Sequence, residues 1–351
     1  MKQLLNDLIA IKSYSGDEKR ISEYIYSFFK NKNANVFEQD GNIVVYIKNN
    51  SKTAMIFNAH MDTVKVQDIS QWNTDPFELV EKDGKYYGLG VSDEKISIAI
   101  LMDIYDELMN SNLDIFLVFV VKEEIDGSGS KSFAEYFINN YNYKNVYCII
   151  CEPRNAKYIG MGNKGNIFFE ISAKGKAAHS SQLELGKNAI DALFKKIKNL
   201  KKDIAKYEEY DDKLGNVTIA CPTIISGGSS VNTIPDNCIA MGDVRTTPNT
   251  HQKIINFLNN NDEIKIFSET KPYILEEENV LVKVFNKLGI KEKQYTTGSN
   301  DAVFFGMLCI PAIVFGAGNE ETIHKPNENV EIKNIEKTKK IYLSLVKELT
   351  I

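Results

Sequence analysis

The chain has 351 residues, of which 43% are hydrophobic and 25% are charged, as is ordinary for a folded globular protein. Its formal net charge of -5 argues against a nucleic-acid-binding protein, which normally gathers basic residues on one face. No segment approaches the roughly 18 apolar residues that a membrane span needs, and acidic residues follow the first apolar positions where a secretory signal would continue apolar. We therefore expect a cytoplasmic protein whose partner is a small molecule, with no nucleic acid and no membrane involved.

The five cysteines favour reduced thiols over a disulfide framework, because their number is odd and the chain is long. Cys148 and Cys151 form a C-x-x-C segment inside an apolar stretch that is typical of a buried strand. Residues three apart on a strand point to opposite faces. We therefore predict that these two cysteines do not share a metal ion.

The first half of the chain has the alternating pattern of an α/β domain. Several of its strands are continuously apolar, which is typical of a sheet that is covered by helices on both faces. The predicted strands are 42–47, 53–58, 115–121 and 146–150, and the predicted helices are 96–110 and 130–138.

The pattern changes at about Asn166 and changes back after Pro272. The order between these points is β-α-β-β-α-β, which indicates a ferredoxin-like unit inserted into the first domain. Its predicted elements are strand 167–175, helix 188–204, strands 217–226 and 237–245, helix 250–260 and strand 264–267. After the insertion we predict helix 280–288, strand 312–315 and helix 332–349.

Histidine is rare in this chain, with only four residues, so the position of each is informative. His60 follows an apolar strand and precedes Asp62 by two residues. A neutral imidazole at the end of a buried strand can bind a metal ion while a nearby carboxylate fixes its tautomer. Taken alone, this pair is weak evidence, and a structural histidine is the better interpretation of it.

Carboxylates recur at comparable positions. Asp93 lies after a glycine-rich turn at the start of a predicted helix, where a helix N-cap would be the ordinary explanation. Glu123 and Glu124 end one apolar strand and Glu152 follows another. Adjacent carboxylates repel each other unless a cation lies among them. Because ligands bind at the strand ends on one edge of an open α/β sheet, we expect these groups to converge there.

His324 follows the predicted strand 312–315 and its glycine turn, so it belongs to the same edge. Two histidines and three or four carboxylates suit a pair of borderline divalent ions such as zinc. Another histidine, His251, matches no motif, and we expect it at the surface.

Several stretches together resemble a known family, the co-catalytic dizinc deacylases and peptidases (clan MH) that include acetylornithine deacetylase, succinyl-diaminopimelate desuccinylase and aminoacylase. The stretches follow the family's order over nearly the whole chain; they are HMDTV, WNTDPF with YYGLGVSD, the EE pair, CEP, KAAHSSQLELGKNAI, SSVNTIPD with DVR, and IHKPNE.

The resemblance implies a cofactor of two divalent metal ions, expected to be zinc, with cobalt and manganese as alternatives. Asp93 would bridge the two ions. His60 and Glu152 would complete one site, and Glu124 and His324 the other. Two such ions about 3.5 to 4 Å apart lower the pKa of a shared water towards neutrality.

The resemblance also implies roles for residues that do not bind metal. Glu123 would be the general base, and Asp62 would orient His60. His179 would polarise the scissile carbonyl, often from the partner subunit. Asn232 and Arg245 resemble residues that hold the substrate carboxylate, and Ser299 lies in TGSNDAVFF, which resembles a glycine-rich substrate loop.

For the fold, the resemblance implies a zinc-exopeptidase-like, three-layer α/β/α catalytic domain with an inserted ferredoxin-like α+β lid domain. The catalytic domain would comprise residues 1–162 and 272–351, and the lid residues 163–271. Hinges are expected near Asn163 and Pro272. By analogy, we expect a homodimer that forms through the lid.

Three functions remain open. The first is hydrolysis of the amide bond of an N-acyl amino acid, in the manner of a deacetylase or desuccinylase. The second is a dipeptidase or aminopeptidase with the same metal chemistry, since the two classes share their ligands and differ in pocket shape. The third is a non-catalytic metal-binding or assembly module, against which Glu123 argues because such a protein needs no free base beside its ligands.

Overall fold

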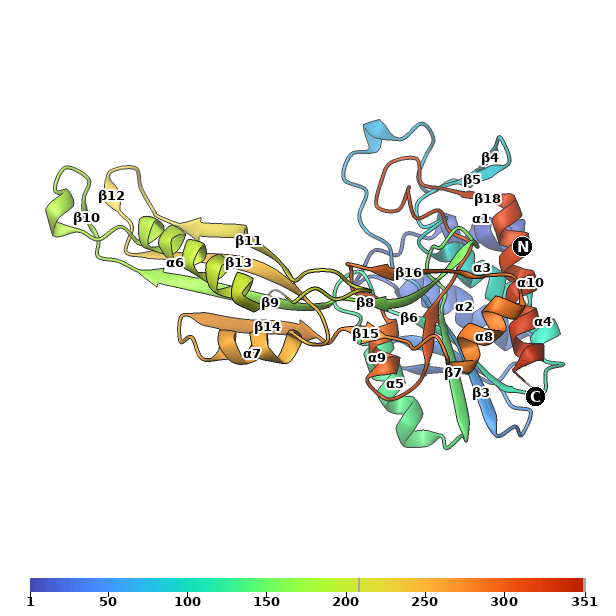
Figure 1. The fold of residues 1–351 in the computed structure, drawn as a ribbon. Helices are drawn as coiled ribbons and strands as arrows, with labels where there is room; N and C mark the ends of the chain where they lie inside the picture. Colours follow the sequence, from blue (N-terminus) through green and yellow to red (C-terminus); the bar gives the residue numbers. More distant parts are fainter. Residues whose placement is uncertain (208, 350–351) are drawn as a thin grey trace. The chain divides into compact units, whose positions relative to one another are not determined.

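A computed structural model describes residues 1–207 and 209–349. The chain divides into two compact units, which are described separately below (Figure 1). The first comprises Met1–Met161, Leu275–Gln294 and Asn300–Ile351, and the second Gly162–Ile274 and Tyr295–Ser299. The changes near residues 162 and 274 lie close to the predicted ones at 163 and 271. The short return of 295–299 to the second unit was not predicted.

The first unit is built on a large mixed sheet with strand order β1-β2-β6-β3-β7-β17-β8. Its four central strands, β6, β3, β7 and β17, run parallel to one another, so their carboxyl ends share one edge. The strands are β1 (Val36–Gln39), β2 (Asn42–Ile47), β3 (Thr53–His60), β6 (Asp114–Val120), β7 (Asn145–Ile150), β8 (Tyr158–Asn163) and β17 (Ala312–Val314).

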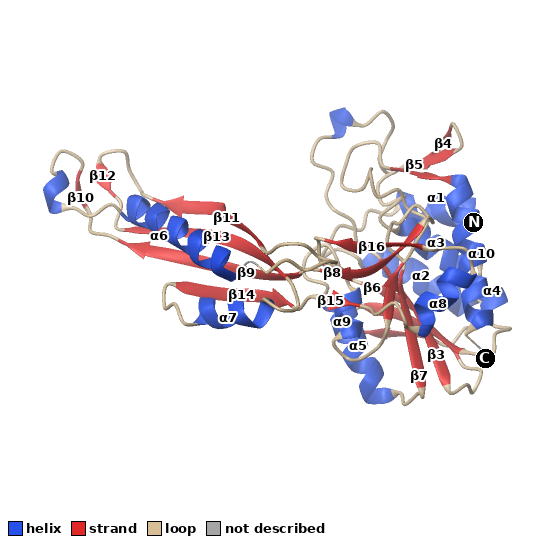
Figure 2. Ribbon diagram, in the orientation of Figure 1, coloured by secondary structure: helices blue, strands red, loops and turns tan. Residues whose placement is uncertain are grey.

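Helices cover both faces of this sheet, as the continuously apolar strands predict (Figure 2). Phe116 and Phe119 of β6 point to opposite faces, being three residues apart. Phe119 stacks on Phe29 of α2 at 5.7 Å between ring centroids, and Phe116 contacts Phe137 of α5 at 5.1 Å. The helices of this unit are α1 (Lys2–Ala10), α2 (Lys19–Asn31), α3 (Lys95–Asp103), α4 (Tyr105–Leu108), α5 (Ser128–Asn140), α8 (Val280–Lys287), α9 (Ala302–Gly306) and α10 (Ile332–Glu348).

Helices α1, α2 and α9 and the break between α3 and α4 were not predicted. The single helix expected over 96–110 is broken at Ile104 into α3 and α4. Helix α2 was missed, although Ile21, Ile25 and Phe29 recur every four residues and are all buried. None of the helices within residues 1–207 and 209–349 has the length and apolar content of a membrane span.

A small antiparallel sheet completes the first unit. Its strand order is β18-β5-β4, and β5 pairs with β18 so that Tyr87 lies opposite Asn329. This pairing brings the glycine-rich turn before Asp93 next to the segment that follows His324. The strands are β4 (Val80–Lys82), β5 (Lys85–Tyr87) and β18 (Asn329–Glu331), and a short helical turn, η1 (Ile69–Gln71), precedes β4.

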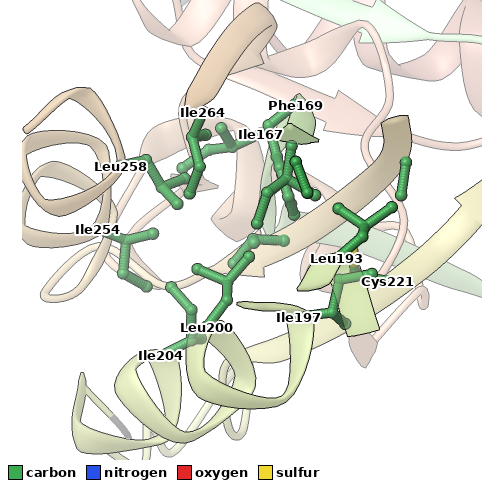
Figure 3. Packing of buried hydrophobic residues seen from close by; sticks show 14 of the residues in the cluster. Ile167, Phe169, Leu193, Ile197, Leu200, Ile204, Cys221, Ile254, Leu258 and Ile264 are labelled. Carbon is green, nitrogen blue, oxygen red and sulfur yellow. The ribbon is translucent and has the colours of Figure 1, made fainter. Parts of the chain in front are cut away.

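The second unit has the predicted β-α-β-β-α-β order in its main elements. Its antiparallel sheet has strand order β11-β13-β9-β14, and α6 and α7 pack on it through apolar side chains such as Leu193, Ile197, Ile254 and Leu258 (Figure 3). The elements are β9 (Gly165–Lys174), α6 (Ala189–Ile204), β11 (Thr218–Gly227), β13 (Asn237–Thr246), α7 (His251–Asn259) and β14 (Ile264–Thr270). Shorter elements of this unit are β10 (Ala178–His179), η2 (Leu183–Leu185), η3 (Ala205–Tyr207), β12 (Thr233–Ile234) and β15 (Tyr273–Ile274). Strand β16 (Glu292–Thr296) has residues in both units.

The expectation that His251 is a surface residue is wrong. His251 is the first residue of α7, is buried, and its Nδ1 lies 2.7 Å from the Thr246 hydroxyl. Burial lowers the pKa of the imidazole to about 4, so the side chain is neutral at physiological pH. The sequence motifs gave no indication of this, because burial here depends on how α7 packs on the sheet.

Candidate metal centre

The carboxyl ends of the parallel strands carry the predicted ligands. His60 is the last residue of β3, and its register partner on β6 is Val120, shortly before Glu123 and Glu124. Glu152 comes two residues after β7, which is the neighbour of β3 on its other side. Three neighbouring strands therefore present their chemical groups at one edge, as predicted.

Asp93 lies between the two histidines. The Nε2 atom of His60 is 3.0 Å from Asp93 Oδ1, and the Nε2 atom of His324 is 3.3 Å from Asp93 Oδ2. Each oxygen of one carboxylate thus faces a different imidazole. Glu124 contacts His324 at 2.8 Å, and Glu152 lies 3.8 Å from His60. This is the pairing of ligands that the resemblance implies for a bridging Asp93.

Asp93 does not cap a helix. Helix α3 begins at Lys95, and the residue in the N-cap position is Glu94, whose side chain makes no capping hydrogen bond. The ordinary structural explanation for an aspartate before a helix therefore does not apply to Asp93. Its carboxylate is buried and directed at the two imidazoles.

The electrostatics of Asp93 and His324 indicate a site that attracts positive charge. Burial opposes ionisation of Asp93, but hydrogen bonds from His324 and His60 outweigh it and hold its pKa well below the usual range. The same contacts with Asp93 and Glu124 raise the pKa of His324 to about 10. Divalent cations placed among these groups would satisfy the same negative charge.

Asp62 makes further contacts at the centre besides the predicted one to His60. The nearer acceptor for His60 Nδ1 is the main-chain oxygen of Asp62, at 2.9 Å, and the carboxylate is 3.6 Å away. The carboxylate accepts hydrogen bonds from the amides of Glu123 and Glu124, each at 3.1 Å, and from the Ser15 hydroxyl at 2.7 Å. Asp62 therefore positions the segment that carries both glutamates as well as the imidazole.

Glu123 has the environment of a proton-accepting group. Burial, together with the negative charges of Glu152 and Asp301, raises the pKa of Glu123 well above its usual range. Burial and the charge of Asp93 likewise raise the pKa of Glu152 to about 8. Carboxylates in such an environment are typical of catalytic sites, where bound cations restore their ionised form.

The donor set fits a pair of divalent ions. One group of side chains whose ligand atoms lie within 4.8 Å of one another is His60, Asp93 and Glu124, and a second is His60, Glu123 and Glu152. His324 adds a second imidazole at the contact distances given above. Mixed nitrogen and carboxylate ligands match the preferences of zinc and related borderline ions.

Four residues with predicted roles belong to the second unit. His179 and Asn232 lie close together, because β10 pairs with β12 and the Ser180 amide donates to the Asn232 carbonyl at 2.9 Å. Both side chains are exposed. Ser299 lies in the 295–299 segment and is partly exposed, and a role in substrate binding stays a prediction for it.

Arg245 lies at the other end of the second unit's sheet. Along β13, Asn237 pairs with Lys174 and Arg245 pairs with Asn166, whereas β10 and β12 lie beyond the Lys174 end (Figure 1). The stretch from Asn237 to Arg245 measures about 25 Å at roughly 3.2 Å per residue. One copy of this unit therefore does not bring Asn232 and Arg245 to the same carboxylate.

Sequence reasoning assigned no role to two buried carboxylates beside the centre. Glu94 accepts a hydrogen bond from the main-chain amide of His60, and Glu328 accepts hydrogen bonds from the amides of Gly90, Ser92 and Asp93. The available signal was their position: Glu94 adjoins Asp93, and Glu328 ends the IHKPNE stretch. The two cysteines of the C-x-x-C segment are free and buried, with no part in the groups described above.

The chain is similar to known proteins over most of its length. Residues 56–348 match Peptidase family M20/M25/M40. The chain is 30% identical to the acetylornithine deacetylase of Buchnera aphidicola subsp. Schizaphis graminum, over 84% of this chain and 81% of that protein. It is 27% identical to a probable succinyl-diaminopimelate desuccinylase of Staphylococcus aureus, over 99% of this chain and 96% of that protein.

Solved structures share the fold. An M20 family metallo-carboxypeptidase from Sulfolobus solfataricus aligns with a TM-score of 0.81 at 21% identity, covering 99% of this chain and 98% of that chain. A tripeptidase from Staphylococcus aureus aligns with a TM-score of 0.77 at 20% identity, covering 99% and 97%. The chain therefore belongs to Peptidase family M20/M25/M40 and is a metal-dependent hydrolase of amide or peptide bonds.

Proposed function

We propose that this protein hydrolyses the amide bond of an N-acyl amino acid, as a deacetylase or desuccinylase does. The observation that carries the proposal is the convergence of two imidazoles and two further carboxylates around Asp93, with Glu123 beside them. The similarity to an acetylornithine deacetylase supports the choice of substrate class. The proposed metal ligands are His60, Asp93, Glu124, Glu152 and His324.

The proposed chemistry divides between the ions and the chain. Two bound divalent ions, which we expect to be zinc, would supply hydroxide at neutral pH and polarise the scissile carbonyl. Glu123 would take the proton of the attacking water and pass it to the leaving amine. Its half-buried position suits this task, because a raised pKa lets a carboxylate hold that proton between the two steps.

We further propose that His179 and Asn232 act on substrate bound by a second copy of the chain, while Arg245 acts in its own copy. The support is the length of sheet that separates Asn232 from Arg245, which exceeds the size of an amino-acid substrate. Two copies could supply both contacts to one free carboxylate. His179 would then stabilise the developing oxyanion from the partner.

A dimer through the second unit is supported by its apolar surface. Strand β11 is at the edge of the sheet order and carries the exposed side chains Ile224 and Ile225, and Val231 follows it. Leu183 and Leu185, near His179, are exposed as well. An unpaired strand edge can pair with another chain, and exposed apolar side chains can mark an interface. A second copy is the occupant that the separated substrate residues require.

Mixing two inactive variants tests this proposal. His179→Ala and Glu123→Gln are each expected to be inactive as homodimers. If His179 acts in the partner, a mixed dimer has one complete site, and random mixing should restore about a quarter of wild-type activity. No recovery, although mixed dimers are shown by size exclusion or mass spectrometry, would place His179 in its own copy.

A peptidase remains the second candidate, since the solved structures with this fold include a tripeptidase. Metal analysis and a substrate screen decide between the two. Purified protein loaded with zinc should contain two equivalents and hydrolyse N-acetyl or N-succinyl amino acids faster than di- or tripeptides. A preference for peptides would favour the second candidate, and two bound ions without hydrolysis of any class would contradict both.

A further inference from the structure

Glu328 lies buried beneath the loop that carries Asp93. Its side chain is 2% exposed and comes directly before β18. Because β18 pairs with β5, the residue before β18 lies opposite the residue after β5, and the Gly88 amide donates to the Glu328 carbonyl at 3.3 Å. The side chain then extends under the next turn of chain.

The Glu328 carboxylate accepts hydrogen bonds from three main-chain amides of that turn. Oε2 accepts from Gly90 at 2.9 Å, and Oε1 accepts from Ser92 at 2.7 Å and from Asp93 at 2.9 Å. Gly90 has φ of 77°, and a Cβ there would lie 2.8 Å from a methyl carbon of Thr63, so the turn has little room to rearrange. The backbone of Asp93 is thus held directly by Glu328.

The proposed ligands differ in what supports them. His60 ends β3, and Glu124 and Glu152 lie four and two residues beyond β6 and β7, so the central sheet positions them. Asp93 and His324 lie instead on loops outside the central sheet, with His324 ten residues beyond β17. Glu328 connects these two loops. It lies four residues after His324, and its carboxylate accepts a hydrogen bond from the amide of Asp93.

A second contact between the same loops has the same effect. The Ser92 hydroxyl donates to the Asn329 carbonyl at 2.7 Å and accepts from the Asn319 amide at 2.8 Å. The loop of His324 is therefore attached to the turn before Asp93 at both of its ends. These ties lie on both sides of the 3.3 Å contact between Asp93 and His324.

We infer that Glu328 is a positioning residue that holds Asp93 and His324 at the spacing needed for the metal ion they share with Glu124. The inference rests on the proposed two-ion centre and deepens it. The affinity for the ion held by His60 and Glu152 should depend on Glu328 much less, because strand ends position both of those ligands. Outer contacts of this kind typically change metal affinity about 10- to 100-fold.

The test is a Co²⁺ titration of the full-length, metal-depleted protein, followed by equilibrium dialysis and visible absorption. Glu328→Gln keeps the shape of the side chain but places an NH₂ group against one of the amides. We expect this variant to keep the first ion and to bind the second about 10- to 100-fold more weakly, with loss of the second ion's absorption bands.

Asp114→Asn is the matched control. Asp114 is also a buried carboxylate that accepts two main-chain amides, those of Asn49 and Ser51, but it lies at the opposite end of β6 from Glu124. It should lose a similar amount of stability and bind both ions normally. Ser92→Ala removes the hydrogen bonds of the Ser92 hydroxyl to Asn329 and Asn319 and leaves Glu328 unchanged. It should also weaken binding of the second ion, which keeps the test open if Glu328→Gln does not fold.

The inference is overturned if Glu328→Gln binds both ions with wild-type affinity and spectrum, or if Asp114→Asn loses the second ion equally. A wild-type protein that binds a single ion would overturn the proposed two-ion centre itself. A wild-type protein that binds two ions but hydrolyses no amide would overturn the proposed function, and the titration would still decide the role of Glu328.

Discussion

Glu123 and Glu124 are adjacent in the chain, yet they have different partners. Glu124 contacts His324 at 2.8 Å, whereas Glu123 belongs to the group with His60 and Glu152. The amides of both residues are held by the Asp62 carboxylate, which fixes the backbone from which the two side chains diverge. The two adjacent carboxylates therefore face different sides of the centre, which suits different roles: metal ligand for Glu124 and, as proposed, general base for Glu123.

Replacing Glu123 by glutamine should abolish turnover and spare metal binding. Removal of a general base typically lowers the rate about 10²- to 10⁴-fold, and glutamine keeps the size of the side chain. The measurements are hydrolysis of the best substrate and metal content of the same sample. Glu124→Gln is the control, because it should lose metal as well as activity; a Glu123→Gln enzyme with wild-type turnover would exclude the proposed base.

At the scale of elements, helix α6 has a clear local cause. The side chain of Asn188 caps its start by accepting from the Ile190 amide at 2.9 Å and the Asp191 amide at 3.5 Å. Asn188→Ala should therefore lower the free energy of unfolding by about 1 kcal/mol. Denaturant unfolding measures this, with Asn188→Asp as the control that keeps an acceptor; equal losses in the two variants would rule out the cap as the cause.

The junction of β13 and α7 should make stability depend on pH through His251. Burial holds the pKa of His251 at about 4 in the folded protein, below the ordinary 6.5. The unfolded chain therefore binds the proton more tightly, and stability is lost as pH falls from 6.5 towards 4. At about 1.4 kcal/mol per pKa unit, the loss should be about 3 kcal/mol.

Comparison with His251→Gln isolates this effect, since the carboxylates titrate in both proteins. Unfolding free energies are measured across the same pH range. The wild type should lose stability relative to the variant as the solution becomes acidic. Parallel pH profiles would show that His251 does not contribute.

At the scale of the whole molecule, metal binding should stabilise the fold, because the ligands come from segments far apart in the chain. An ion that binds only the folded state adds about 2.7 kcal/mol when its free concentration is 100 times its Kd. Treatment with a chelator should lower Tm and abolish activity, and Zn²⁺ should restore both. Ca²⁺, which prefers oxygen ligands, is the control and should restore neither; an unchanged Tm after verified metal removal would contradict the prediction.

Much of this protein could be predicted from local sequence. Apolar runs marked the strands, and the groups that follow them, such as His60 and Glu152, could be assigned to one edge because parallel strands end together. The order of elements in the second unit could be predicted because the spacing of apolar residues differs between helices and strands. Periodicity and position along a strand are properties of short segments.

Other features were decided only by the tertiary structure. The burial of His251, the separation of Asn232 from Arg245 and the ties from Glu328 to Asp93 all depend on which segments pack or pair together. A pattern of apolar residues states which face of an element is buried, but not which distant loop will lie against it. Strand pairing supplies that information, and here the pairing of β5 with β18 brings the loops of Asp93 and His324 together.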